Sequence, residues 1–387
     1  MEEFQIQDNQ LIRYLGHAQN VIIPKGISLI GTEAFRDCSE ITSVVVPEGV
    51  THLGDAVFMN CINLNDIRLP ESLKSIGECA FLHCVSLKQI VLPPEIKSLS
   101  RQLFHSCEQL TSVFLPDNLS QIGIGAFEAC TALKSIRLPE HVLRIQKDAF
   151  AFCTGLKHVE LSTDLRFIEE SVFSGCTSLT HIELPSRLTH IAPSAFESCS
   201  NLMVIEVDPK SLSFSSQNGL LYNYSGDTLL LCPPCREKVI LPQGVKCIES
   251  YAFFSNRQLR QIELPESLER IESSAFTFCE NLKRVRIPKS IDYVDEHAFH
   301  SGTKLIGFKK QRKPHILSPL TRLWLSISGW GEAVFYLIGF FVDSAFKRMQ
   351  CRMKHEPVPS YRSLLVHRGF GGPPEDEDED DDDDDDE

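Results

Sequence analysis

The sequence predicts a solenoid, a stack of short repeats in which each repeat buries its apolar face only against its neighbours. Three observations predict this fold class. Phenylalanine recurs every 23 residues, proline precedes nearly every one by eleven residues, and cysteine follows most of them by three. The phenylalanines are Phe35, Phe58, Phe81, Phe104, Phe127, Phe150, Phe173 and Phe196, and the interval resumes at Phe253, Phe276 and Phe299.

Each repeat predicts the same short elements. In residues 70–92, PESLKSIGECAFLHCVSLKQIVL, Ile90 and Leu92 alternate with exposed positions, as in a half-buried strand. Proline then ends the strand, because it has no N–H to donate to the ladder. The Ala-Phe-x-x-Cys stretch has apolar positions three apart, which favours a helical or 3₁₀ turn. One repeat is therefore expected to hold a short strand, a proline corner, an extended piece and a helical turn.

This repeat resembles the unit of the BspA-like (Treponema pallidum-type) leucine-rich repeat proteins, P-x-x-[VL]-x-x-I-G-x-x-A-F-x-x-C-x-x-L-x-x-V-x-L. The resemblance covers residues 24–308, and residues 1–23 are similar to the family's degenerate first repeat. It implies a right-handed leucine-rich repeat solenoid of 23-residue units, with a concave parallel β-sheet and short helical turns on the convex side. It also implies roles in adhesion or protein interaction, and it brings no catalytic residues.

The repeat phase and the composition predict how the chain is organised. Residues 208–241 interrupt the phase and carry turn signals at Asn218-Gly219 and Ser225-Gly226-Asp227, which predicts a β-hairpin island. The expected segments are a capping repeat at 1–23, eight repeats at 24–207, the island at 208–241, three repeats at 242–308, a basic and apolar helix at 309–354, a linker at 355–374 and a disordered acidic tail at 375–387.

Charge and motifs exclude several classes of function. The formal net charge is −14, but residues 375–387 are all Asp or Glu, so the rest of the chain is nearly neutral. A nucleic-acid binder would need a basic stripe, which is missing. The sequence also has no P-loop, no G-x-G-x-x-G after a strand and no nucleophile motif. We therefore expect a monomeric, non-enzymatic protein without a cofactor.

The cysteines predict a reducing environment. Nine of the 14 occupy one repeat position, where parallel stacking gives each thiol two equivalent neighbours and no specified disulfide partner. Cys232 and Cys235 have C-x-x-C spacing, but no second ligand pair follows, so a Pro-Pro corner is favoured over zinc or redox chemistry. The first residues lack the pattern of a signal peptide. A cytoplasmic location is the expectation.

The apolar segment 323–342 has two interpretations. Its twenty residues hold a single charge, Glu332, and basic residues flank both ends. This length would cross a bilayer, which would give a membrane-associated protein. Alternatively, Glu332 and the glycines of the segment favour a helix that caps the last repeat. Both interpretations stay open.

The outward-facing strand positions are the candidate contact residues, because a solenoid builds a surface rather than a pocket. Their first half is apolar and basic, and their second half is acidic, which would suit a basic partner. The candidates are Val45, Arg68, Val91, Phe114, Arg137, His158, Glu160, His181, Glu183 and Glu206.

Two further groups of side chains have the chemistry of a contact site or a metal site. Tyr222 and Tyr224 in the island either contact a partner or pack on the solenoid flank. His158, Glu160, His181 and Glu183 could ligate a metal across two repeats, but such pairs are common on sheets, so no metal site is expected. The predicted function is a scaffold that presents a concave surface to a protein partner. The alternative is a membrane-tethered, adhesin-like receptor anchored through residues 323–342.

Overall fold

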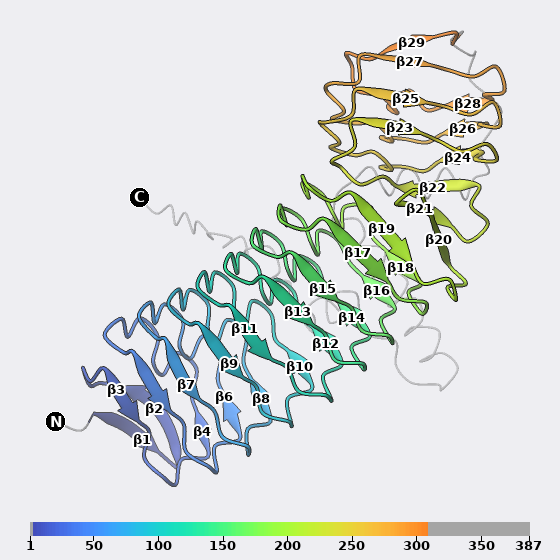
Figure 1. Ribbon diagram of the computed structural model, residues 1–387. Helices are drawn as coiled ribbons and strands as arrows, with labels where there is room; N and C mark the ends of the chain where they lie inside the picture. The colour runs from blue at the N-terminus through green and yellow to red at the C-terminus, as the bar shows by residue number, and fades with distance from the viewer. Residues whose placement is uncertain (1–2, 309–387) are drawn as a thin grey trace, which may run out of the picture. The chain divides into compact units, whose positions relative to one another are not determined.

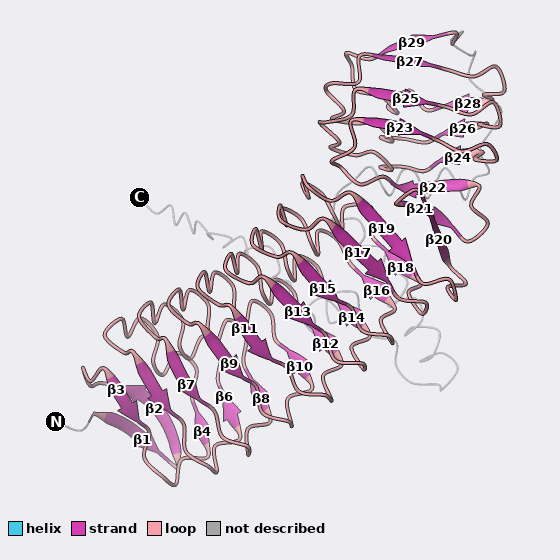
Figure 2. Ribbon diagram, in the orientation of Figure 1, coloured by secondary structure: helices cyan, strands magenta, loops and turns pink. Residues whose placement is uncertain are grey.

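A computed structural model describes residues 3–308 as a stack of parallel rungs (Figure 1). Every regular element in this range is a β-strand, and most strands pair in parallel with the strand one rung away (Figure 2). The predicted solenoid with its 23-residue period is therefore confirmed. The predicted helix at 309–354, the linker and the acidic tail lie outside the described residues. Among residues 3–308 no helix is present that could span a membrane.

One side of the stack is formed by strands of three or four residues, which we call the long-strand face. The inward-facing residue of most of these strands is buried and its neighbours point outward, as the alternation in the sequence predicts. The strands are β3 (Asn20–Ile22), β5 (Ser43–Val45), β7 (Asp66–Arg68), β9 (Gln89–Val91), β11 (Ser112–Phe114), β13 (Ser135–Arg137), β15 (His158–Glu160), β17 (His181–Leu184), β19 (Val204–Val207), β23 (Lys238–Ile240), β25 (Gln261–Glu263), β27 (Arg284–Arg286) and β29 (Lys304–Ile306).

A second ladder of two-residue strands forms the short-strand face, where the sequence predicts an extended piece. Strand β23 falls within the range predicted for the island, so the ninth rung begins earlier than its proline indicates. The strands of this second ladder are β4 (Leu29–Ile30), β6 (His52–Leu53), β8 (Ser75–Ile76), β10 (Ser98–Leu99), β12 (Gln121–Ile122), β14 (Arg144–Ile145), β16 (Phe167–Ile168), β18 (His190–Ile191), β24 (Cys247–Ile248), β26 (Arg270–Ile271) and β28 (Tyr293–Val294).

The third side of each rung differs from the predicted helical turn. It consists of consecutive tight turns, and residues 3–308 contain no helix. Residues two before and two after the phenylalanine adopt left-handed backbone angles, for example Ala56 (φ 50°) and Asn60 (φ 61°) around Phe58. These angles break a helix after one turn. The freed N–H groups point along the stack, and that of Phe58 donates to the Ala80 carbonyl of the next rung at 2.8 Å.

The phenylalanines form a continuous stack inside the rungs. From Phe58 to Phe196 successive ring centroids lie 5.2–5.6 Å apart, with planes 5–20° from parallel. All of these rings are 0–2% exposed. Because the rung spacing of a parallel ladder is about 4.8 Å, identical rings on successive rungs pack without a gap between them. The 23-residue period is therefore a packing requirement.

The thiol of the repeated cysteine links its rung to the preceding rung by a hydrogen bond. The Sγ–H of Cys107 donates to the Phe81 carbonyl of the preceding rung at 3.2 Å, and that of Cys130 donates to Phe104 at 3.2 Å. We call the cysteines three residues after the phenylalanines the cysteine column. The same bond recurs for every cysteine of this column from Cys61 to Cys199 and for Cys279. No disulfide is present among the cysteines of residues 3–308. The column therefore holds small, buried donors that satisfy a turn carbonyl.

Burial of the column thiols predicts a loss of stability at alkaline pH. Desolvation raises the pKa of Cys153 and Cys199 from 9.0 to about 12. Folding therefore favours the protonated thiol, and this stabilisation is complete below about pH 9 and is lost as the pH rises toward 12. The melting temperature should fall steadily above about pH 9, and alkylation at pH 8 should leave the buried cysteines from Cys84 to Cys199 unlabelled while half-buried thiols such as Cys79 react. Rapid alkylation of these buried cysteines in the native protein, or a melting temperature that stays constant up to pH 11, would contradict this prediction.

Two antiparallel hairpins begin the two runs of rungs. The first joins β1 (Phe4–Gln7) to β2 (Gln10–Tyr14), and β2 pairs in parallel with β4. The second joins β21 (Leu220–Asn223) to β22 (Thr228–Leu231), and β22 pairs in parallel with β24. Each hairpin contains a register shift in its first strand. The island, predicted as a hairpin, also includes β20 (Phe214–Gln217), which pairs with β21.

The contacts of the two hairpins match position by position. Leu11 and Leu229, each 24 residues before the first phenylalanine of its run, accept hydrogen bonds from Gly31 and Glu249 at 2.8 and 2.9 Å. The buried apolar residues divide at the same place, with one core ending in the island and a second extending from Leu220 to Ala298. The island therefore interrupts the stack and starts it again in the way β1 and β2 start it.

Candidate partner-binding face

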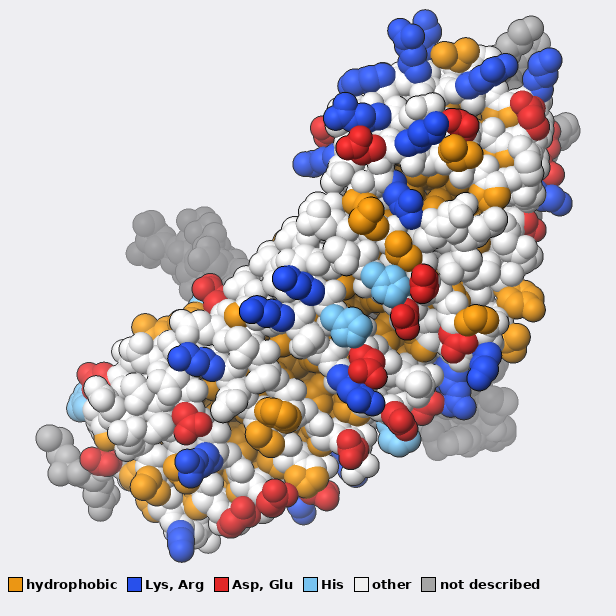
Figure 3. Space-filling model, viewed as in Figure 1, with side chains coloured by type: hydrophobic (Ala, Val, Ile, Leu, Met, Phe, Trp, Pro, Cys, Tyr) orange, Lys and Arg blue, Asp and Glu red, His pale blue; other side chains and the backbone are white. Residues whose placement is uncertain are grey.

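The long-strand face carries large apolar side chains in its first half. Phe114 on β11 lies directly beside Val91 on β9, and their side chains are 57% and 63% exposed. They border a shallow groove that also contains Arg68, Asp117 and Pro94. Figure 3 shows hydrophobic side chains gathered over β9 and β11. The two side chains together leave a continuous apolar area in contact with water on this part of the face.

The apolar group differs in two members from the sequence prediction. Val45, predicted to be an exposed contact residue, is half-buried, because it lies between Ile22 and Arg68 on the neighbouring strands. Ile22 is 73% exposed and was not predicted as a contact residue. Outward positions are counted from the phenylalanine that precedes each strand, and no such phenylalanine precedes Ile22. Ile22 nevertheless stands thirteen residues before Phe35, which is the outward position of the repeat.

The second half of the face is acidic, and three of its five predicted glutamate and histidine residues form ion pairs with side chains on a neighbouring strand. Arg137 Nε lies 3.4 Å from Glu160 Oε1, and His181 Nε2 lies 3.4 Å from Glu206 Oε2. Glu183 lies directly opposite Glu206 in the parallel register of β17 and β19. A groove over these strands contains all of them except Arg137, together with His158. The like charges predicted across adjacent rungs therefore meet at Glu183 and Glu206.

The last two strands of the long-strand face are basic. Arg284 on β27 lies beside Lys304 on β29, and Arg286 lies two residues along β27 on the same face. Within residues 3–308 none of the three forms an ion pair, whereas Lys238 on β23 pairs with Glu263 at 2.8 Å. Figure 3 shows several Lys and Arg side chains over the final rungs. The face therefore changes along the stack from apolar to acidic and then to basic.

The island tyrosines separate into one core residue and one surface residue. Tyr222 is 2% exposed and belongs to the second core, and burial raises its pKa to about 12. Of the two alternatives for Tyr222, packing on the solenoid is therefore the one observed, because β21 lies between the two cores and both of its faces are covered. Tyr224 is 62% exposed and stays a candidate. Cys232 is buried and Cys235 half-buried at a turn, and both are free thiols.

The chain belongs to the BspA type leucine-rich repeat proteins. Six copies of the BspA type leucine rich repeat region match residues 8–134, 120–223 and 232–316, most of the chain. The predicted family is therefore confirmed. A comparison with curated proteins finds no significant match.

Solved structures of bacterial repeat proteins are similar to this chain. A leucine rich cell surface protein from Faecalibacterium prausnitzii is 26% identical over 78% of this chain and 85% of its own, with a TM-score of 0.52. The leucine-rich repeat protein of T. pallidum is 33% identical over 46% of this chain and 88% of its own, with a TM-score of 0.44. A leucine-rich repeat protein from Bacteroides ovatus is 25% identical over 80% of this chain and 99% of its own, with a TM-score of 0.46.

Proposed function

We propose that the protein is a non-enzymatic, monomeric scaffold whose long-strand face binds another protein. The observation that carries this proposal is the exposed pair Val91 and Phe114, because a side chain such as Phe114 left 57% exposed gains from burial against a partner. Membership of a repeat family without shared catalytic residues supports it.

The charge of the face restricts the chemistry of the partner. Glu183 and Glu206 lie in register, and Glu183 has no ion pair within residues 3–308, so the face favours a partner that is apolar at one end and basic at the other. We propose that binding takes place in the cytoplasm, since free, buried thiols of the column type persist in reducing compartments.

Site-specific photocrosslinking in the native cell tests the proposal. A photoreactive residue placed at Phe114 or Val91 should give one dominant protein adduct, because these side chains would lie within the interface. The same residue placed at the exposed Ser75 or Ser98, on the short-strand face, is the matched control and should give none. Equal adducts from both faces, or none from Phe114, would contradict the proposal.

The acidic half gives the same experiment a second readout. Changing Glu160, Glu183 and Glu206 to Gln should reduce adduct formation through Phe114 and make the remainder insensitive to salt, because screened attraction would be lost. A control triple with Gln at the exposed Glu95, Glu140 and Glu266, which lie in the corners after the prolines, removes the same charge elsewhere. A similar loss in both variants would mean that net charge, and not this face, attracts the partner.

The surface receptor stays a second proposal. The F. prausnitzii protein is described as a cell surface protein, which favours it. Its anchor would be segment 323–342, outside the described residues. A carbonate wash of cell membranes distinguishes the two, since an anchored chain stays in the pellet.

A further inference from the structure

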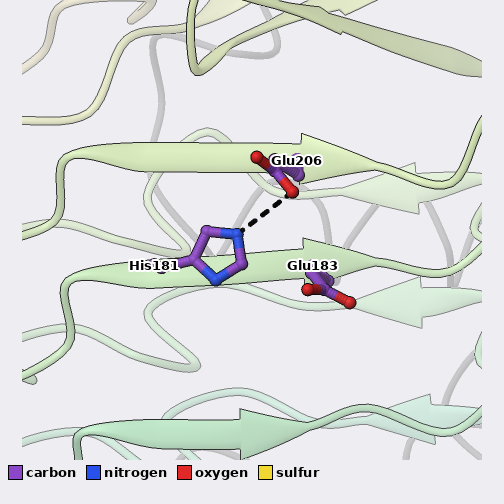
Figure 4. A group of neighbouring side chains, drawn as sticks. All are labelled: His181, Glu183 and Glu206. Atoms are coloured by element: carbon purple, nitrogen blue, oxygen red, sulfur yellow. Dashed lines mark ion pairs between the residues drawn. The ribbon is translucent and has the colours of Figure 1, made fainter.

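Three side chains with metal-ligating atoms meet on the long-strand face. His181 and Glu183 lie two residues apart on β17, and Glu206 lies on the adjacent β19. One donor atom from each lies within 4.8 Å of both others. Figure 4 shows the His181 ring reaching toward Glu206, with Glu183 beside it.

The backbone fixes this arrangement. Residues two apart on a strand share one face, and neighbouring parallel strands are about 4.8 Å apart, so the three side chains rise from the corners of a small triangle. Glu183 and Glu206 are register partners, which places their carboxylates directly side by side. His158 and Glu160, which the sequence offers as ligands with equal reason, do not join the group.

The distances fit a metal ion bound by nitrogen and oxygen. With bonds of about 2.0–2.2 Å, neighbouring ligands of a tetrahedral ion lie about 3.3–3.6 Å apart. His181 Nε2 and Glu206 Oε2 are already 3.4 Å apart. The Glu183 carboxylate lies within 4.8 Å of both and needs to approach by at most about 1.5 Å, which requires only rotation of an exposed side chain around staggered bonds.

Electrostatics favour an ion at this point. Two carboxylates in register repel each other, and a divalent cation neutralises both while the imidazole stays uncharged. The nearest arginine of the long-strand face, Arg137, is already paired with Glu160. One imidazole with two carboxylates suits a transition metal better than calcium or magnesium, which prefer oxygen ligands alone.

We propose that His181, Glu183 and Glu206 bind one divalent transition-metal ion, with a fourth position open to solvent. The sequence predicted no metal site for a different set of residues, His158, Glu160, His181 and Glu183, which lacks Glu206. The inference does not depend on the proposed partner, because it concerns the isolated chain.

Titration of the full chain with Zn²⁺, followed by calorimetry and by the melting temperature, tests the proposal. The wild type should bind one ion at this site and melt at a higher temperature with Zn²⁺, because only the folded state brings His181, Glu183 and Glu206 together. His181→Ala and Glu206→Gln should each weaken binding at least about tenfold, the loss typical of impaired metal sites, and abolish the thermal shift.

Matched variants separate this site from other donors of the chain. His158→Ala removes a neighbouring imidazole outside the group, so Zn²⁺ binding should be unchanged. Co²⁺ in place of Zn²⁺ should give no intense thiolate absorption in the near ultraviolet, because no cysteine takes part. Binding that survives His181→Ala, is lost equally in His158→Ala, or shows thiolate absorption would overturn the proposal.

Discussion

Replacement of Phe127 by alanine should lower the free energy of unfolding by about 3–5 kcal/mol. The ring is fully buried between Phe104 and Phe150, with centroids at 5.4 and 5.2 Å. Its removal opens a cavity on two rung interfaces at once, and the hydrogen-bonded turns of both neighbours hold the walls apart. Urea unfolding followed by circular dichroism measures the loss.

Phe152→Ala is the control for this prediction, since the same residue type is 53% exposed there. It should change stability by no more than about 0.5 kcal/mol. Phe196→Ala should cost less than Phe127→Ala, because Phe196 stacks on Phe173 at only one side within the described residues. Equal losses at Phe127 and Phe152 would mean that the stack does not stabilise the solenoid.

The rungs were predictable from the sequence because one packing solution is repeated. A phenylalanine stack, a cysteine donor and an alternating strand each impose one residue type at one position, so the period is visible in Phe58, Cys61 and Ile67 alike. The turn was not predictable. Its left-handed positions hold residues as different as Glu33, Ala56 and Cys79, because backbone bonds to the next rung, and not side chains, stabilise them.

The candidate site was predictable where alternation applies. Val91, Phe114 and Glu206 are exposed as expected. Alternation failed in the island, where Leu220, Leu221 and Tyr222 are consecutive residues of β21 and all three are buried. Both faces of this strand are covered, because Leu221 packs in the first core and its two neighbours pack in the second. The grouping of His181 with Glu206 depends on strand register and side-chain rotation, which the period does not contain.

Replacement of Arg236 by alanine should split the unfolding of residues 4–308 into two transitions. Nη2 of Arg236 donates to the Met203 carbonyl at 2.7 Å and to the Asn218 carbonyl at 2.8 Å. One side chain thus hydrogen-bonds both to the end of the first run, at Met203, and to the island turn, at Asn218. Gly219 beside it makes room, since a Cβ there would lie 2.7 Å from Nη2.

The size of the effect follows from the two hydrogen bonds that the substitution removes. Hydrogen bonds from a charged donor contribute about 1.5–3 kcal/mol each, and alanine would leave both carbonyls without this donor. The Ile205 N–H bond to the Gly219 carbonyl at 3.1 Å and the Gln258 bond to Ser200 at 3.0 Å would persist. In a solenoid, stability is a sum of rungs and interfaces, so weakening one interface separates the runs on each side.

Hydrogen exchange with peptide resolution shows which run opens. In Arg236→Ala, amides of residues 220–308 should exchange faster than in the wild type, while those of residues 58–196 keep their protection, because the run of three rungs has the smaller core. Arg260→Ala removes a neighbouring arginine whose ion pair with Glu237 spans 3.9 Å on the surface, and it should leave a single transition. A single transition in Arg236→Ala, with protection lost equally in both runs, would show that the island transmits stability through its strands alone. In that case β20 and β21, rather than the arginine, would be the element that makes the two runs cooperative.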